Sequence, residues 1–130
     1  MANEWKWKRG PRITTRATAA AAMSKGQPCY ISSNVATASA DGGTVDLVAA
    51  EDIASAAIGT YIVPCGDVFE VKTGADLGIF DRAYMAGSNV VDAGSSSQVD
   101  CGFVLDYNPA SSGCALISVN SALNMRKAYG

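Results

Sequence analysis

Short runs of apolar or alternating residues, separated by turn-forming residues, recur along the chain from residue 28 onward. Two of them, TVDLV at 44–48 and DVFEV at 67–71, alternate between apolar and polar positions, which is typical of strands with one buried face. Glycine, Ser-Asn or Asn-Pro sequences bound most of the runs, as expected of tight turns. The pattern predicts strands at 28–31, 44–48, 60–63, 67–71, 82–85, 101–105 and 114–119. Short strands at this spacing are typical of a sandwich or a barrel.

One short helix is predicted at 49–57, where the sequence reads AAEDIASAA. Glu51 and Asp52 would lie in its first turn, where the helix dipole favours anions. A weak internal repeat relates residues 30–38 to residues 84–93, and each copy contains a Ser-Asn pair that tolerates a left-handed backbone. Duplication and the chance likeness of two hairpins both account for this repeat.

The first sixteen residues, MANEWKWKRGPRITTR, differ from the rest of the chain. Pro11 biases Gly10 away from a helix, and the β-branched stretch from Arg12 to Thr18 favours a strand wherever a sheet edge is offered. We therefore expect residues 1–17 to form an extended basic arm and residues 18–130 to form a separate β-rich domain. Both tryptophans and five of the ten basic residues lie here, the basic ones being Lys6, Lys8, Arg9, Arg12 and Arg16.

Charge divides the chain in the same way. Residues 1–25 carry six basic groups against Glu4, a balance of +5, and residues 26–130 carry four against eleven acidic groups, a balance of −7. An acidic body with a basic arm indicates a segment that reaches for a partner. The large side chains are few, with three Phe and two Trp, so self-association is expected to supply additional burial.

Candidate chemistry is sparse. The chain has no histidine and no nucleophile-elbow, phosphate-loop or dinucleotide-binding motif, so we expect no enzymatic activity, no metal ion and no cofactor. No apolar run reaches the roughly 18 residues of a membrane span, and no signal peptide is apparent. The cysteines are expected to be reduced and packed in or near the core, and they are Cys29, Cys65, Cys101 and Cys114.

Several short motifs resemble the capsid decoration (cement) proteins of tailed phages. The run from Met23 to Ile31, MSKGQPCYI, with a Ser-Asn turn beyond it, is similar to the opening of that family. An acidic element at 50–54, a Gly-aromatic-Val-Leu strand at 102–105 and a closing strand after Gly113 follow in the family's order. The resemblance covers roughly residues 18–120. The long basic arm and Cys29, where an aliphatic residue is usual, depart from the family's pattern.

The resemblance implies a mostly-β fold, a small β-barrel or β-tulip-like domain with one short helix and an extended N-terminal arm. It further implies a structural virion protein, made in the host cytoplasm, that sits on the outer surface of an icosahedral phage head as a homotrimer. Its partner would be the major capsid protein, whose subunits it would clamp, with no nucleic acid or membrane involved. A single-stranded nucleic-acid-binding barrel and a non-catalytic β subunit of another assembly remain alternatives.

The arm is the candidate capsid-binding segment. Trp5 and Trp7 are two residues apart, so they would project to one side of an extended chain and anchor it, with Lys6 and Lys8 on the other side. The end from Arg12 to Arg16 could add a strand to a capsid sheet, and the arm would become ordered only on docking. Its removal is expected to leave the fold and the oligomer intact. The residues expected at the contact are Trp5, Lys6, Trp7, Lys8, Arg9, Arg12, Ile13, Thr14, Thr15 and Arg16.

Overall fold

The computed structural model describes residues 3–40, 43–73, 77–87, 89–92, 100–108 and 113–121. The mostly-β expectation is confirmed, and each of the seven predicted runs overlaps a strand, although at 44–48 only the last two residues belong to one. The strands are β1 (Lys6–Arg9), β2 (Ile13–Ala19), β3 (Pro28–Ser32), β4 (Val35–Ala38), β5 (Leu47–Ala49), β6 (Ile58–Val63), β7 (Cys65–Lys72), β8 (Arg82–Met85), β9 (Val91–Asp92), β10 (Asp100–Asn108) and β11 (Cys114–Asn120).

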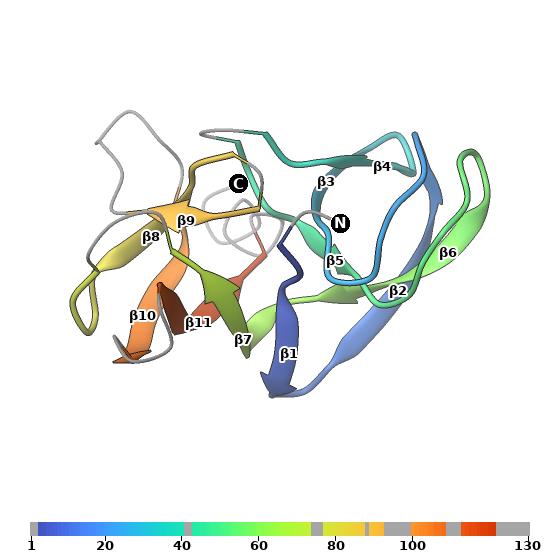
Figure 1. The fold of residues 1–130 in the computed structure, drawn as a ribbon. Helices are drawn as coiled ribbons and strands as arrows, with labels where there is room; N and C mark the ends of the chain where they lie inside the picture. The colour runs from blue at the N-terminus through green and yellow to red at the C-terminus, as the bar shows by residue number, and fades with distance from the viewer. Residues whose placement is uncertain are drawn as a thin grey trace.

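The strands form two sheets that lie side by side (Figure 1). The first has six strands in the order β1-β7-β11-β10-β8-β9, and all neighbouring pairs are antiparallel. In the second, the pairing runs in a closed ring, β2-β4-β3-β5-β6, in which β2 and β4 are parallel and the other pairs antiparallel. Strand β1 therefore opens the chain in one sheet and β2 continues it in the other.

Strands β3 and β4 are joined by a tight turn of two residues. Ser33 and Asn34 both have positive φ, 51° and 68°, which is the backbone of a two-residue turn whose twist suits a hairpin. The left-handed geometry expected of the Ser-Asn pair is thus confirmed at this copy. In the second copy Asn89 has a φ of 60°, while Ser88 lies outside the described residues.

Strands β5 and β6 separate two apolar cores, because successive side chains point to opposite faces of a sheet. Val48 and Ile62 face the six-stranded sheet and join its core with Phe69, whereas Leu47 and Tyr61 face the interior of the closed ring. The first core is the larger one and includes Trp5, Leu77, Met85, Val104 and Ile117. A single layer of two strands therefore contributes to both cores.

The helix predicted at 49–57 is wrong. Ala49 ends β5, and Ile53 instead exchanges two backbone hydrogen bonds with Met23, at 2.8 and 2.9 Å. The carboxylate of Glu51 accepts from the amide of Thr60, and that of Asp52 accepts from the amide of Lys25. The two acidic residues thus satisfy distant backbone donors, not the amides of a helix start.

The structure also differs from the expected division into an arm at 1–17 and a domain at 18–130. The segment is extended, but β1 pairs with β7 and β2 pairs with β6 along six residue pairs. The alternation of side chains along an extended strand explains the difference, since it places the rings of Trp5 and Trp7 on one face. Burying both rings against the core of the same chain is favourable without any partner. The segment from residue 3 to residue 17 therefore contributes β1 to one sheet and most of β2 to the other.

Among the described residues there is no helix that is long and apolar enough to cross a membrane.

Candidate functional site

Nine of the ten candidate residues fall into three groups in the structure, and Arg12 lies at the bend between the strands. The first group is the pair of tryptophans. Trp5 is only 1% exposed, and its Nε1 donates to the carbonyl oxygen of Asn89 at 2.8 Å. Its ring lies 6.1 Å from that of Phe69 at an interplanar angle of 54°. Trp7 turns to the same side and packs partly buried against the same core. Both rings thus share one face as predicted, but that face belongs to this chain, so Trp5 is no surface anchor here.

Asp67 fixes the remainder of the segment. Its carboxylate is fully buried and accepts three hydrogen bonds of 2.9 Å, from Trp7 Nε1, the amide of Arg12 and the amide of Cys65. A buried carboxylate needs such donors, because unpaired it would cost several kcal/mol. The guanidinium of Arg12 lies 5.5 Å from the centroid of the Trp7 ring, within cation–π range. The bend from β1 into β2 is thereby held at its inner side by one side chain.

The second group, Lys6, Lys8 and Arg9, lies exposed on β1, on the face of the six-stranded sheet that points away from the second sheet. Lys6 is paired across the strands with Glu70, and the Nζ of Lys8 lies 3.9 Å from the Oε1 of Glu70. An exposed ion pair of this kind contributes little stability. These cations are therefore held in place by their strand and remain available to a partner.

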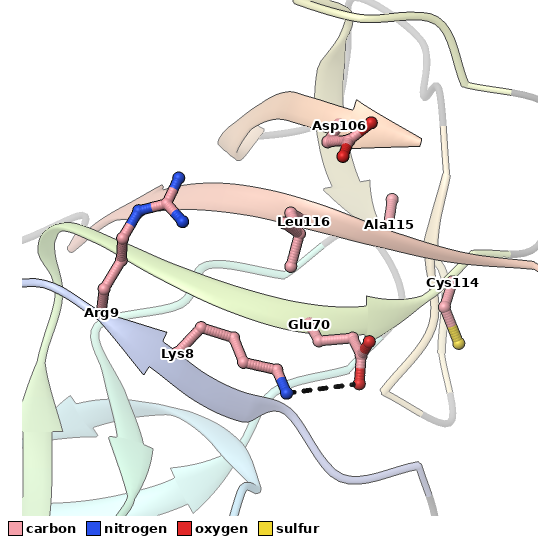
Figure 2. A pocket seen from close by; sticks show the side chains of 7 residues that line it. All are labelled: Lys8, Arg9, Glu70, Asp106, Cys114, Ala115 and Leu116. Atoms are coloured by element: carbon pink, nitrogen blue, oxygen red, sulfur yellow. Dashed lines mark ion pairs between the residues drawn. The ribbon is translucent and has the colours of Figure 1, made fainter. Parts of the chain in front are cut away.

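A shallow hollow of about 300 Å³ opens in this face beside the basic residues (Figure 2). Lys8 and Arg9 from β1 and Glu70 from β7 stand on one side of it, and Asp106 from β10 stands across from them. The other lining residues are Cys114, Ala115 and Leu116. Opposite charges thus border the hollow from its two sides.

The third group is the first half of β2, where Ile13, Thr14, Thr15 and Arg16 are all exposed. One edge of this stretch pairs with β6, but β4 reaches only Thr18 and Ala19 on the other edge. On that other edge, which faces β4, the amides of Thr18 and Ala20 donate to the carbonyl oxygens of Asn34 and Ala36.

Amides alternate in direction along a strand, so those of Thr14 and Arg16 must point to that same side. Within the described ranges no strand pairs with them there. The start of β2 consequently presents a free, basic and β-branched edge. Of the residues expected at a contact, this edge with Arg12 and the three cations of β1 are the ones the structure leaves on the surface.

Sequence reasoning missed the polar residues that hold the segment in place. Gln27 and Asn89 exchange two side-chain hydrogen bonds, of 2.8 and 3.0 Å, across the two sheets. For Asp67 a signal was available, because it shares the inward-facing positions of its strand with Phe69 and Val71. A carboxylate at an inward-facing position indicates a buried hydrogen-bond acceptor.

The four cysteines are free thiols, and burial separates them into two pairs. Cys29 and Cys101 are buried, and burial raises the pKa of each thiol to about 12. Packing in or near the core was expected of all four; it is confirmed for Cys29 and Cys101, whereas Cys65 and Cys114 are half-buried at strand starts. In the described part of the chain no three Cys, Asp or Glu side chains gather as a metal site would require.

The six-stranded sheet and the closed ring of strands, with a core between them, define a mostly-β domain over the described residues. Its fold is similar to that of the head fiber gp8.5 N base of bacteriophage phi29, with a TM-score of 0.60. The match covers 83% of this chain and 93% of that one at 12% sequence identity, so it establishes a common fold. No family model and no curated protein sequence matches the chain.

Proposed function

We propose that this protein is a structural component of a phage virion that sits on the outer surface of the head. The observation that carries the proposal is the fold shared with the base of a phage head fiber over most of both chains. The short motifs between residues 23 and 113 that resemble capsid decoration proteins also support it. No catalytic step and no cofactor enters this function.

The partner we propose is the major capsid protein, contacted through Arg12 and the free edge of β2. No described strand pairs with the backbone amides and carbonyls of Thr14 and Arg16 at that edge, and backbone pairing binds an extended segment with little demand on its sequence. Exposed guanidinium groups at both ends of the stretch favour an acidic segment. Because Trp5 and Asp67 hold the edge in place, docking would not incur the entropy cost of ordering a free arm.

Clamping follows if several such edges act together. A single edge of four residues, 13–16, binds modestly, but a homotrimer presents three of them to neighbouring capsid subunits. Linked sites raise the overall affinity by roughly 10²–10⁴ when all can reach their partners. The proposal thus combines a weak contact per copy with an oligomer that bridges subunits.

The alternative of a single-stranded nucleic-acid-binding barrel depended on tryptophans that would stack on bases. Trp5 is 1% exposed, and Trp7 packs partly buried against the core with the guanidinium of Arg12 5.5 Å from its ring centroid. These rings therefore do not offer the open faces that stacking needs. A gel shift with single-stranded DNA at low and at high salt tests this alternative directly.

Cosedimentation with heads of the parent phage assembled without this protein tests the proposal. The variant Arg12→Glu/Arg16→Glu should lose most of its binding, and the loss should shrink as salt rises. Lys25→Glu, an exposed cation on a different part of the surface, serves as the matched control and should bind like the wild type. Binding of the wild type to naked DNA but not to heads would overturn the proposal.

A further inference from the structure

The outward face of the six-stranded sheet carries two unlike flanks at its two sides. The basic flank consists of Lys6, Lys8 and Arg9 on the edge strand β1. The acidic aromatic flank lies around β8 and β10 and consists of Ile79, Phe80, Phe103, Asp100 and Asp106. Strands β7 and β11 separate them.

A turn at 78–81 presents the apolar part of the second flank. The amide of Asp81 donates to the carbonyl oxygen of Gly78, and the Asp81 carboxylate accepts from the Gly78 amide at 2.8 Å. The amide of Phe80 donates to the carbonyl oxygen of Val104, which ties the turn to β10. The exposed side chains are therefore carried by an anchored backbone.

Phe80 is held in an unusual state for an aromatic residue. Its φ is 69°, a left-handed conformation that is strained for a bulky side chain, and the ring is 70% exposed. Ile79 beside it is 57% exposed, and the Phe80 ring lies 6.4 Å from the ring of Phe103. A strained turn that displays adjoining apolar side chains to water is typical of a contact surface.

The charges around the two flanks are complementary. Around the aromatic flank, Asp81, Asp92, Asp100 and Asp106 stand against Arg82, which is paired with Asp100, so the local balance is −3. On the basic flank three cations stand against Glu70, so the local balance is +2. One molecule thus carries both an acidic surface and a basic surface whose charges are complementary.

We propose that copies of this chain associate by packing the acidic aromatic flank of one copy against the basic flank of another. The apolar rings and Ile79 supply the area removed from water, and the opposite charges fix which sides meet. Like flanks repel each other, so the contact joins unlike flanks, and such contacts close into rings when the rotation between copies allows it. This inference does not depend on binding to a phage head.

Sedimentation velocity of the full chain over a range of concentrations tests the contact with a charge exchange. Lys8→Glu alone and Asp106→Lys alone should each weaken self-association by about tenfold or more, because each places like charges opposite one another. Lys8→Glu/Asp106→Lys in one chain restores opposite charges and should return to within a few-fold of the wild type. Because Lys8 and Asp106 also border one hollow of the same chain, an equimolar mixture of the two single variants is the control. Unlike copies in the mixture bring opposite charges together and should associate, whereas an effect within one chain would persist.

Phe80→Asn provides the second arm, since asparagine tolerates a left-handed backbone while removing the ring. It should weaken association at both low and high salt, whereas the charge variants act mainly at low salt. Thermal unfolding of each variant verifies that the fold is kept. A wild-type chain that stays monomeric at every concentration, or a double variant no better than the singles, would overturn the proposal.

Discussion

The indole Nε1 of Trp5 donates a hydrogen bond of 2.8 Å to the carbonyl oxygen of Asn89, across 84 residues of sequence. The side chain of Asn89 in turn exchanges two hydrogen bonds with Gln27, the residue before β3. One buried asparagine in the turn between β8 and β9 therefore connects the start of the chain with both sheets. The N-terminal segment is part of the core that this network surrounds.

Replacing Trp5 by alanine should accordingly destabilise the whole fold. Loss of a buried tryptophan of this kind typically lowers the free energy of unfolding by about 3–5 kcal/mol, and the amide network loses a donor as well. Urea denaturation followed by circular dichroism measures the change. Lys6→Ala, at the exposed neighbouring position, should shift the free energy by no more than about 0.5 kcal/mol. Removal of residues 1–16 should be at least as damaging as Trp5→Ala, contrary to the expectation of a dispensable arm.

Asp67→Asn should loosen the bend between β1 and β2. The amide keeps one acceptor oxygen, but it cannot accept all three hydrogen bonds that the carboxylate receives, so a loss of about 1–3 kcal/mol is expected. Tryptophan emission should shift to longer wavelength as Trp7 gains access to water. Asp106→Asn makes the same chemical change on the surface and should leave both readings unaltered; equal effects of the two variants would contradict the role of Asp67.

Thiol labelling should divide the cysteines by position. Cys65 and Cys114 are half-buried and should react with a maleimide in the folded protein at pH 7.5, whereas Cys29 and Cys101 should react only on unfolding. Mass spectrometry after digestion assigns the label to each residue. Fast labelling of Cys29 in the folded state would show that the interior of the closed ring opens readily.

The buried thiols also predict a dependence of stability on alkaline pH. Below about pH 9 the thiols of Cys29 and Cys101 are protonated in both states, so they add no pH dependence. Between pH 9 and about 12 the unfolded chain releases these protons and the folded chain retains them. The free energy of unfolding should therefore fall as pH rises, by about 1.4 kcal/mol per pH unit for each thiol. Urea midpoints at pH 8 and pH 10 should differ less in Cys29→Ala/Cys101→Ala than in the wild type.

Tyr61→Phe should leave the protein as stable or make it more stable. The Tyr61 side chain is fully buried in the closed ring, and its hydroxyl has no hydrogen-bond partner among the described residues. Burial raises the pKa of this phenol, and the nearby Cys29 raises it further. Removing an unsatisfied hydroxyl relieves a desolvation cost of about 1–3 kcal/mol. A loss of stability on thermal unfolding would instead reveal a partner for the hydroxyl, such as a bound water molecule.

The sequence predicted the strands where apolar periodicity was strong and missed those where it was weak. Strand β4 reads VATA and β9 has two residues, so neither carries enough apolar area to stand out. The helix at 49–57 was predicted from Glu51 and Asp52, whose actual partners, Thr60 and Lys25, are set by tertiary structure. Local charge patterns do not reveal which distant amide will reach a carboxylate.

The candidate site was predictable in its composition but not in its placement. The period of two correctly grouped Trp5 with Trp7, and the basic residues remained exposed. Which surface receives the two rings depends on the register of β1 against β7, and that register is fixed by long-range pairing. The free edge of β2 likewise arises only because β4 stops pairing at Thr18, a feature with no local sequence signal.

Strands β6 and β7 are separated by Pro64 alone, yet one belongs to the closed ring and the other to the six-stranded sheet (Figure 1). A pulling force applied to either sheet therefore passes to the other through this stretch of extended backbone as well as through the bend from β1 into β2. Each strand has paired neighbours on both sides, β5 and β2 for β6, and β1 and β11 for β7. Tension along this stretch loads many ladder hydrogen bonds in parallel, so the two sheets bear mechanical stress as one body.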